Sequence, residues 1–208
     1  MDGIILDMSN LINSFVMTFI PLFIVINAFD KIPVIISLSE DMSKRERFKM
    51  INTATLTAAI VGLVFLFFGQ FILSVMGISI GSFAIAGGII LLILAIRYMI
   101  SGRMLDVVKE EMVAVVPIGT PLTVGPGTMT ALLLLSTQFP LWIVLVSLAL
   151  NIAIAWVVFL SSDPIIKFMG QGGIKAMSKV FSLLLAAIAV NMMIKGLSLC
   201  EIVKLPSL

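Results

Sequence analysis

The chain of 208 residues has no histidine, one cysteine and few charged side chains, which make up 12% of it. Without histidine it lacks the commonest transition-metal ligand. The single Cys200 cannot form a disulfide or a paired redox site within the chain. The long apolar stretches also contain no pair of carboxylates. These absences argue against an enzyme that works through a metal or an acid–base pair.

Apolar residues dominate what is present. They form 61% of the sequence, and the mean hydropathy is +1.24. A soluble domain carries about 25% charged and roughly 45–50% apolar residues, and it still needs a polar exterior. A chain of this size cannot hide so much apolar surface from water, so the composition predicts an integral membrane protein.

Apolar runs long enough to cross a bilayer, about 20 residues each, occur six times. No charge lies between Lys49 and Arg97, and Gly77 divides that stretch in two; Pro140 divides the uncharged stretch from Met112 to Ser162. We therefore predict an all-α, polytopic membrane protein with spans at Leu11–Leu38, Ile51–Met76, Ile80–Ile96, Met112–Ser136, Leu141–Ser161 and Val180–Leu199.

The basic residues fall on one side of this arrangement. Ten lie in the loops after the first, third and fifth spans, whereas only Lys195 and Lys204 lie on the opposite side, and Lys31 lies within the first span. Because cytoplasmic loops are enriched in lysine and arginine, we expect those three loops inside the cell. We therefore expect a multi-pass protein of the cell's inner or plasma membrane, with both termini outside.

This topology predicts an internal repeat. Spans one to three cross the membrane in the opposite sense to spans four to six, as in the inverted repeats of many secondary transporters. We expect residues 1–208 to form one membrane domain, with repeats at residues 11–100 and 112–199. Pro21 precedes Asn27 by six residues, and Pro117 precedes Thr123 by six. A six-span protein without a repeat is the alternative.

The first span contains two adjacent ionisable residues, Asp30 and Lys31, followed by Pro33. Buried charges at bilayer depth are costly unless they are paired or hydrated, and proline removes a backbone donor and crowds the preceding turn. We therefore predict an interruption around residues 28–32. Asp30 either contacts a substrate or is neutralised locally by Lys31, whose ammonium could instead reach toward the cytoplasmic face.

The fourth span contains three prolines and three glycines between Pro117 and Thr128, which excludes a continuous regular helix. Irregular backbone at this depth is tolerated only against protein or a water-filled cavity. Both interruptions should therefore line one cavity near the midplane. The alternative is a pair of kinks for packing, since Gly119, Thr123 and Gly127 are four apart. Close helix contact is likewise expected at Gly87–Gly88 and at Ala149 with Ala153.

Each interruption exposes helix-end amides, which suit a carboxylate, and helix-end carbonyls, which suit an ammonium group or a cation. The carbonyls are those near Val25 to Asn27 and near Thr120 to Thr123. A small zwitterion matches such a pair of ends. The candidate binding residues are Asn27, Ala28, Phe29, Asp30, Pro33, Thr120, Thr123, Gly125, Pro126, Gly127 and Thr128.

Over nearly its whole length the chain resembles the MarC family, also called the SnatA-like neutral amino acid transporters. The stretch from Asn27 to Pro33 is similar to the family's Asn-Pro-x-Gly-x-x-Pro segment, and Val124–Thr128 to its Ala-Gly-Pro-Gly-Thr/Ala segment. The resemblance implies transport of small neutral amino acids such as glycine and alanine, with coupling to a proton or sodium gradient and no other cofactor. Ala28 and Asp30 depart from the family's proline and glycine, which puts substrate choice and ion coupling in question.

Three other functions stay open: export of another small solute or a cation, an intramembrane enzyme, and a scaffold that transports nothing. Besides a small neutral amino acid, the expected partners are the lipid bilayer and, as one option, further copies of the chain in a homo-oligomer. No nucleic-acid partner is expected.

Overall fold

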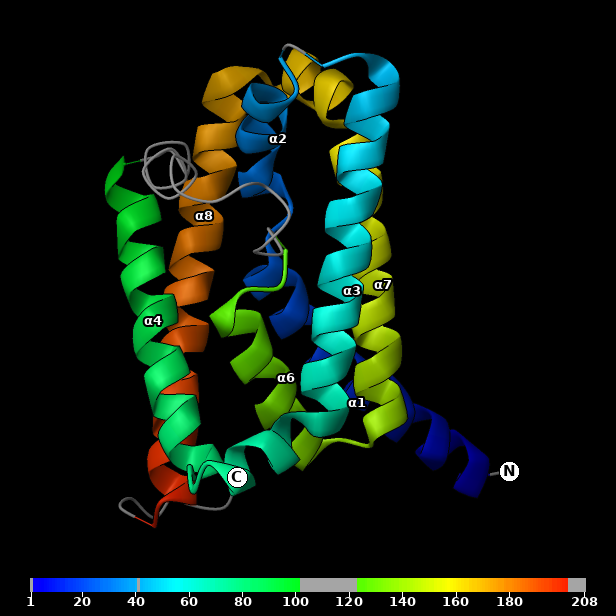
Figure 1. Cartoon of the computed structure of the whole chain (residues 1–208). Coiled ribbons are helices and arrows are strands. Elements are labelled where there is room, and N and C mark those ends of the chain that lie inside the picture. The colour runs from blue at the N-terminus through cyan, green and yellow to red at the C-terminus, as the bar shows by residue number, and fades with distance from the viewer. Residues whose placement is uncertain (1, 41, 102–122, 202–208) are drawn as a thin grey trace.

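The computed structural model describes residues 2–40, 42–101 and 123–201, and within these ranges helices joined by short turns are the regular structure (Figure 1). The elements are α1 (Asp2–Ile26), the 3₁₀ turn η1 (Phe29–Lys31), α2 (Ile32–Leu38), α3 (Lys44–Val75), α4 (Ile80–Ser101), α6 (Pro126–Gln138), α7 (Leu141–Leu160) and α8 (Ser162–Leu199).

Five stretches of the described residues are long and apolar enough to cross a membrane: Ser9–Leu38, Lys44–Val75, Ile80–Ile100, Leu141–Leu160 and Gly172–Leu199. They correspond to the first, second, third, fifth and sixth predicted spans. The fourth predicted span is described only from residue 123 onward, because residues 112–122 lie outside the described ranges. The six-span inverted repeat and its division at residues 11–100 and 112–199 therefore stay predictions.

The sixth span differs most from its prediction. The sequence predicts a loop between Ser161 and Val180, but α8 starts at Ser162 and runs to Leu199. It consists of two helices joined at Gly170, whose φ of 64° and ψ of 172° are not helical. Glycine tolerates positive φ without a steric penalty. Lysines of the expected loop therefore lie on a helix that extends beyond the apolar stretch.

The helices form two groups that share α6. In Figure 1, α4 and α8 stand side by side on one flank, α3 and α7 on the other, and α6 lies between them. Leu132 of α6 belongs to a core with residues of α1, α2, α3 and α7, whereas Leu134 packs with α4 and α8. The short α6 thus has buried side chains on both sides.

Small residues let α4 approach its neighbours, as expected for Gly87–Gly88. A Cβ atom on Gly88 would lie 2.8 Å from the Ala189 carbonyl oxygen, and one on Gly87 would collide with the side chain of Thr130. Two different helices, α8 and α6, thus pack against adjacent glycines. The expectation for Ala149 and Ala153 is wrong within this chain, because both are exposed and line a cavity beside α7.

Candidate functional site

The first helix is interrupted where the sequence predicts it. α1 ends at Ile26, Asn27 has a φ of 39°, η1 follows, and α2 starts at Ile32. Asparagine enters the left-handed region more readily than most residues because its short polar side chain can hydrogen-bond locally. Pro33 lies in the first turn of α2, where a helix tolerates proline.

The Asp30 carboxylate has two donors. Its Oδ2 accepts a hydrogen bond from the Asn27 side-chain amide, and its Oδ1 accepts one from the Ser178 hydroxyl of α8. Only 5% of Asp30 is exposed. A buried carboxylate requires such partners, because the charged form is costly to remove from water. The contact with Ser178 fixes the interruption against α8.

Lys31 has a different partner. Its ammonium donates to the backbone carbonyl of Ile26, the last residue of α1. The chain's own lysine therefore occupies one of the helix-end carbonyls that the sequence offers to a substrate's ammonium group or a cation. Asp30 and Lys31 do not form an ion pair with each other. Arg47 and Asp163 form the ion pair found among the described residues.

The amides at the start of α2 are also largely used. Lys31 N–H donates to the carbonyl of Ala28, and Ile32 N–H donates to that of Phe29. Pro33 has no N–H group to offer. The start of α2 is thus a weaker anion site than the sequence alone indicates.

The start of α6 has no side-chain cap among the described residues. Gly125 is the N-cap residue and has no side chain with which to cap the helix, and Pro126 follows it. The amides of Gly127 and Thr128 belong to the first turn, where a helix supplies no internal acceptor. A Cβ atom built on Gly125 would meet no described residue within 4 Å, so none of these residues fills the space beside this helix end. Thr120 lies outside the described residues.

The first interruption and the residues just before α6 each contain a buried polar atom without a hydrogen-bond partner in the described part of the chain: Asn27 Oδ1 and Thr123 Oγ1. The two residues are only 4% and 2% exposed. Buried polar groups are nearly always satisfied by protein or by water, and exceptions need a physical explanation. Among the described residues, Thr55 Oγ1 and Asn151 Oδ1 are the others in this state.

The first interruption and the start of α6 belong to helices in contact. α1 contacts α6, and in Figure 1 the end of α1 and the start of α6 both lie well inside the bundle. Ser178 is six residues from Gly172 and 21 from Leu199 on α8, or about 9 and 32 Å at 1.5 Å per residue. Within the apolar stretch Gly172–Leu199, the contact with Asp30 therefore lies slightly nearer to the Gly172 end than to the middle.

α8 also supplies an aromatic wall that the sequence did not indicate. Phe181 stacks on Phe29 with ring centroids 6.1 Å apart and lies 5.9 Å from Phe23. Ser178 and Phe181 were not predicted as site residues, since Ser178 fell within the expected loop and a phenylalanine in a span carries no distinguishing pattern.

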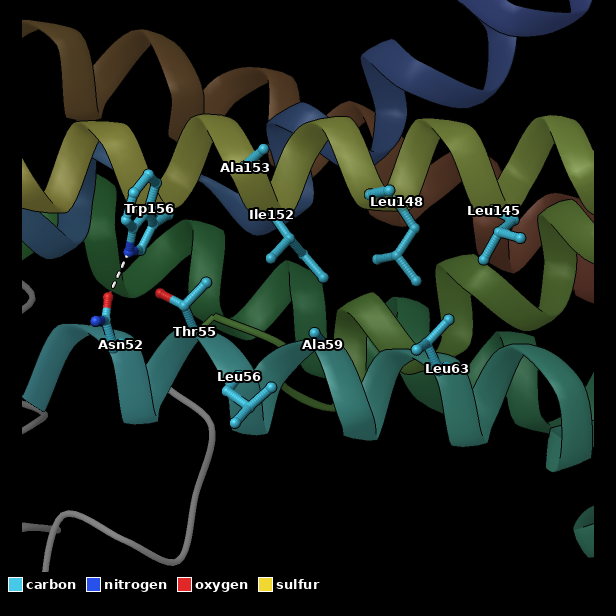
Figure 2. A pocket seen from close by; sticks show the side chains of 11 residues that line it. Asn52, Thr55, Leu56, Ala59, Leu63, Leu145, Leu148, Ile152, Ala153 and Trp156 are labelled. Carbon is cyan, nitrogen blue, oxygen red and sulfur yellow. Dashed lines mark hydrogen bonds between the residues drawn. The ribbon is translucent and has the colours of Figure 1, made fainter. Parts of the chain in front are cut away.

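A separate cavity lies elsewhere in the bundle. It has a volume of about 510 Å³, lies between α3 and α7, and is lined by apolar side chains with Asn52, Thr55 and Trp156 at one end (Figure 2). The indole of Trp156 donates to Asn52 Oδ1 at 2.7 Å. No residue of either interruption lines it, so we do not assign the substrate to it.

Comparison with known proteins gives the family. Residues 12–200 match the model of the MarC family integral membrane proteins. A UPF0056 membrane protein of Methanocaldococcus jannaschii is 30% identical, over 88% of this chain and 95% of its own length. The UPF0056 membrane protein YhcE of Escherichia coli is 32% identical, over 86% of this chain and 89% of its own. No solved structure matches. The chain belongs to the MarC family of integral membrane proteins.

Proposed function

We propose that this protein is a secondary transporter of small neutral amino acids of the glycine and alanine type. The observation that carries the proposal is the pair of buried, unpartnered polar atoms, Asn27 Oδ1 and Thr123 Oγ1, one at each helix interruption. In a static, purely structural kink, such atoms would only weaken the fold, because each costs roughly 1–3 kcal/mol of desolvation.

The two sides of the proposed site have complementary chemistry. Asn27 Oδ1 is an acceptor and suits the substrate's ammonium group, whereas the first-turn amides of Gly127 and Thr128 are donors and suit its carboxylate. The Thr123 hydroxyl can serve either group. A zwitterion with a short side chain satisfies both ends and leaves no charge unpaired.

The remaining parts of the proposal concern architecture. We propose six spans in two inverted repeats, with the basic loops in the cytoplasm, both termini outside and the site between the broken helices. The Arg47–Asp163 pair, at 2.6 Å, joins the starts of α3 and α8 at the proposed cytoplasmic end. The acceptor side of the site, held to Ser178, lies toward that same end.

Labelled glycine and alanine counterflow in proteoliposomes tests the proposal, with imposed proton and sodium gradients to identify the coupling ion. Thr123→Val is the key variant, because valine keeps the shape and removes a hydroxyl that the fold leaves unused. We expect counterflow about tenfold slower, corresponding to one lost hydrogen bond to a charged group, with stability equal to or above that of the parent chain.

Thr55→Val is the matched control. It removes a hydroxyl that is likewise unpartnered but lines the cavity between α3 and α7, so counterflow should be unchanged. Normal counterflow in Thr123→Val, or no counterflow of any neutral amino acid in the parent chain, contradicts the proposal.

Asp30 is the observation that favours the second candidate, export of another small solute or a cation, because it adds a buried carboxylate to the first interruption. The present contacts weigh against direct cation binding, since both carboxylate oxygens already accept hydrogen bonds from Asn27 and Ser178. A thermal-shift screen separates the two functions: stabilisation by a metal ion and by no amino acid would favour the second.

A further inference from the structure

A second cavity, of about 380 Å³, extends toward the end of the bundle opposite the Arg47–Asp163 pair, and its deepest lining residues, Pro21 and Ala131, lie six residues before Asn27 and three after Thr128. It is a groove between α1 and α8 whose floor is formed by α6. Its α1 wall includes Val16, Met17 and Ile20, which are 42%, 60% and 48% exposed. Because the chain is an integral membrane protein, this open apolar wall faces hydrocarbon.

The polar residues of the groove gather at its outer end. Lys195 is four residues from the end of α8, and Gln138 is the last residue of α6. Lys195 Nζ donates to Gln138 Oε1 at 2.6 Å. Asn191 lies one turn deeper on the same face of α8 and is exposed.

The ammonium group of Lys195 has no anionic partner in the described part of the chain. Lys195 contacts an uncharged amide, and the ion pair found in these ranges is formed by Arg47 and Asp163. An ammonium group has three donors and Gln138 takes one. The side chain of Asn191 makes no hydrogen bond within the described residues, although amides at bilayer depth normally face protein, water or a polar ligand.

We propose that this groove binds one anionic glycerophospholipid. Its phosphate accepts hydrogen bonds from Lys195 and Asn191, and one acyl chain lies along Val16, Met17 and Ile20 of α1. The position fits this occupant, since Lys195 and Gln138 are at helix ends, where headgroups lie, and the apolar walls continue toward the bilayer centre. The lipid then fills the gap between α1 and α8.

Native mass spectrometry tests this binding, after reconstitution in nanodiscs of equal parts phosphatidylglycerol and phosphatidylcholine and mild detergent extraction. The parent chain should retain one phosphatidylglycerol that Lys195→Gln retains about fivefold less, as expected for the loss of one basic residue's attraction to an anionic lipid. Ile20→Trp, which fills the groove, should lose the same molecule. The double variant should lose no more.

Two controls separate this site from general attraction to the membrane. Ile12→Trp adds the same bulk at an α1 position that is 58% exposed but outside the groove, and it should retain the lipid. Added inorganic phosphate should not displace it.

Three results would overturn the assignment. The first is unchanged retention in Lys195→Gln and Ile20→Trp. The second is additive losses in the double variant, which indicate that the two residues act on different bound lipids. The third is an unchanged lipid count with slower glycine counterflow in Lys195→Gln, which identifies the groove as an outer entry for the substrate.

Discussion

Replacing Ser178 by alanine removes the hydroxyl that holds Asp30 to α8. The Asp30 carboxylate is 5% exposed and then keeps a single donor, the Asn27 amide. A hydrogen bond to a charged group contributes about 1.5–3 kcal/mol, and a buried acceptor left short of partners costs a similar amount. We therefore expect Ser178→Ala to lower the free energy of unfolding by about 2 kcal/mol.

Ser182 provides the matched control one turn further along α8. It is fully buried, but its hydroxyl donates at 2.8 Å to the Lys179 carbonyl of its own helix. That carbonyl belongs to the helix ladder and keeps its backbone partner, so Ser182→Ala should cost less than about 1 kcal/mol. Reversible unfolding in mixed micelles, followed by circular dichroism, compares the two variants.

The Asp30 contact gives a further check on the assignment. In a double-mutant cycle, Ser178→Ala and Asp30→Asn should couple strongly, because each removes part of one buried interaction. Ser178→Thr, which keeps the hydroxyl, should recover most of the lost stability. Equal costs for Ser178→Ala and Ser182→Ala, together with no coupling to Asp30, would refute the reasoning.

Two further predictions concern packing. Gly196→Ala should lower the free energy of unfolding by about 1–3 kcal/mol, because its Cβ would lie 2.7 Å from the Gly81 carbonyl oxygen of α4. A Cβ on Gly172 meets no described residue within 4 Å, so Gly172→Ala should change the free energy of unfolding little. Thermal unfolding of both variants checks this. Trp156→Phe should cost about 1 kcal/mol by leaving the Asn52 side chain without its indole donor, and Asn52→Ala should make Trp156→Phe nearly neutral in the same assay.

The first interruption could be predicted because its causes are local. A charge pair and Pro33 within one span are incompatible with a regular apolar helix, and the structure interrupts α1 at Asn27. The partners of those charges could not be predicted. That Lys31 reaches back to the Ile26 carbonyl depends on the left-handed turn at Asn27, and that Ser178 meets Asp30 depends on the packing of α8.

The error at the start of α8 has a physical origin. Lys167, Lys175 and Lys179 suggested a polar loop, but lysine is a good helix former, and the long side chain carries its charge away from the apolar surface. The helix therefore continues through the lysines and bends only at Gly170. Charge indicates where a span leaves the apolar region, whereas glycine and proline indicate where the helix itself breaks.

The central claim, that a substrate occupies the space beside the start of α6, is tested most directly by labelling a cysteine at Gly125. Gly125 has an ordinary extended conformation, and none of the described residues lies within 4 Å of its Cβ position, so Gly125→Cys suits a Cys200→Ser background. The account predicts that a small methanethiosulfonate reagent modifies this cysteine and that saturating alanine slows the reaction severalfold, while Gly172→Cys in the same background reacts unprotected. Equal rates with and without alanine, and with and without glycine, would contradict it.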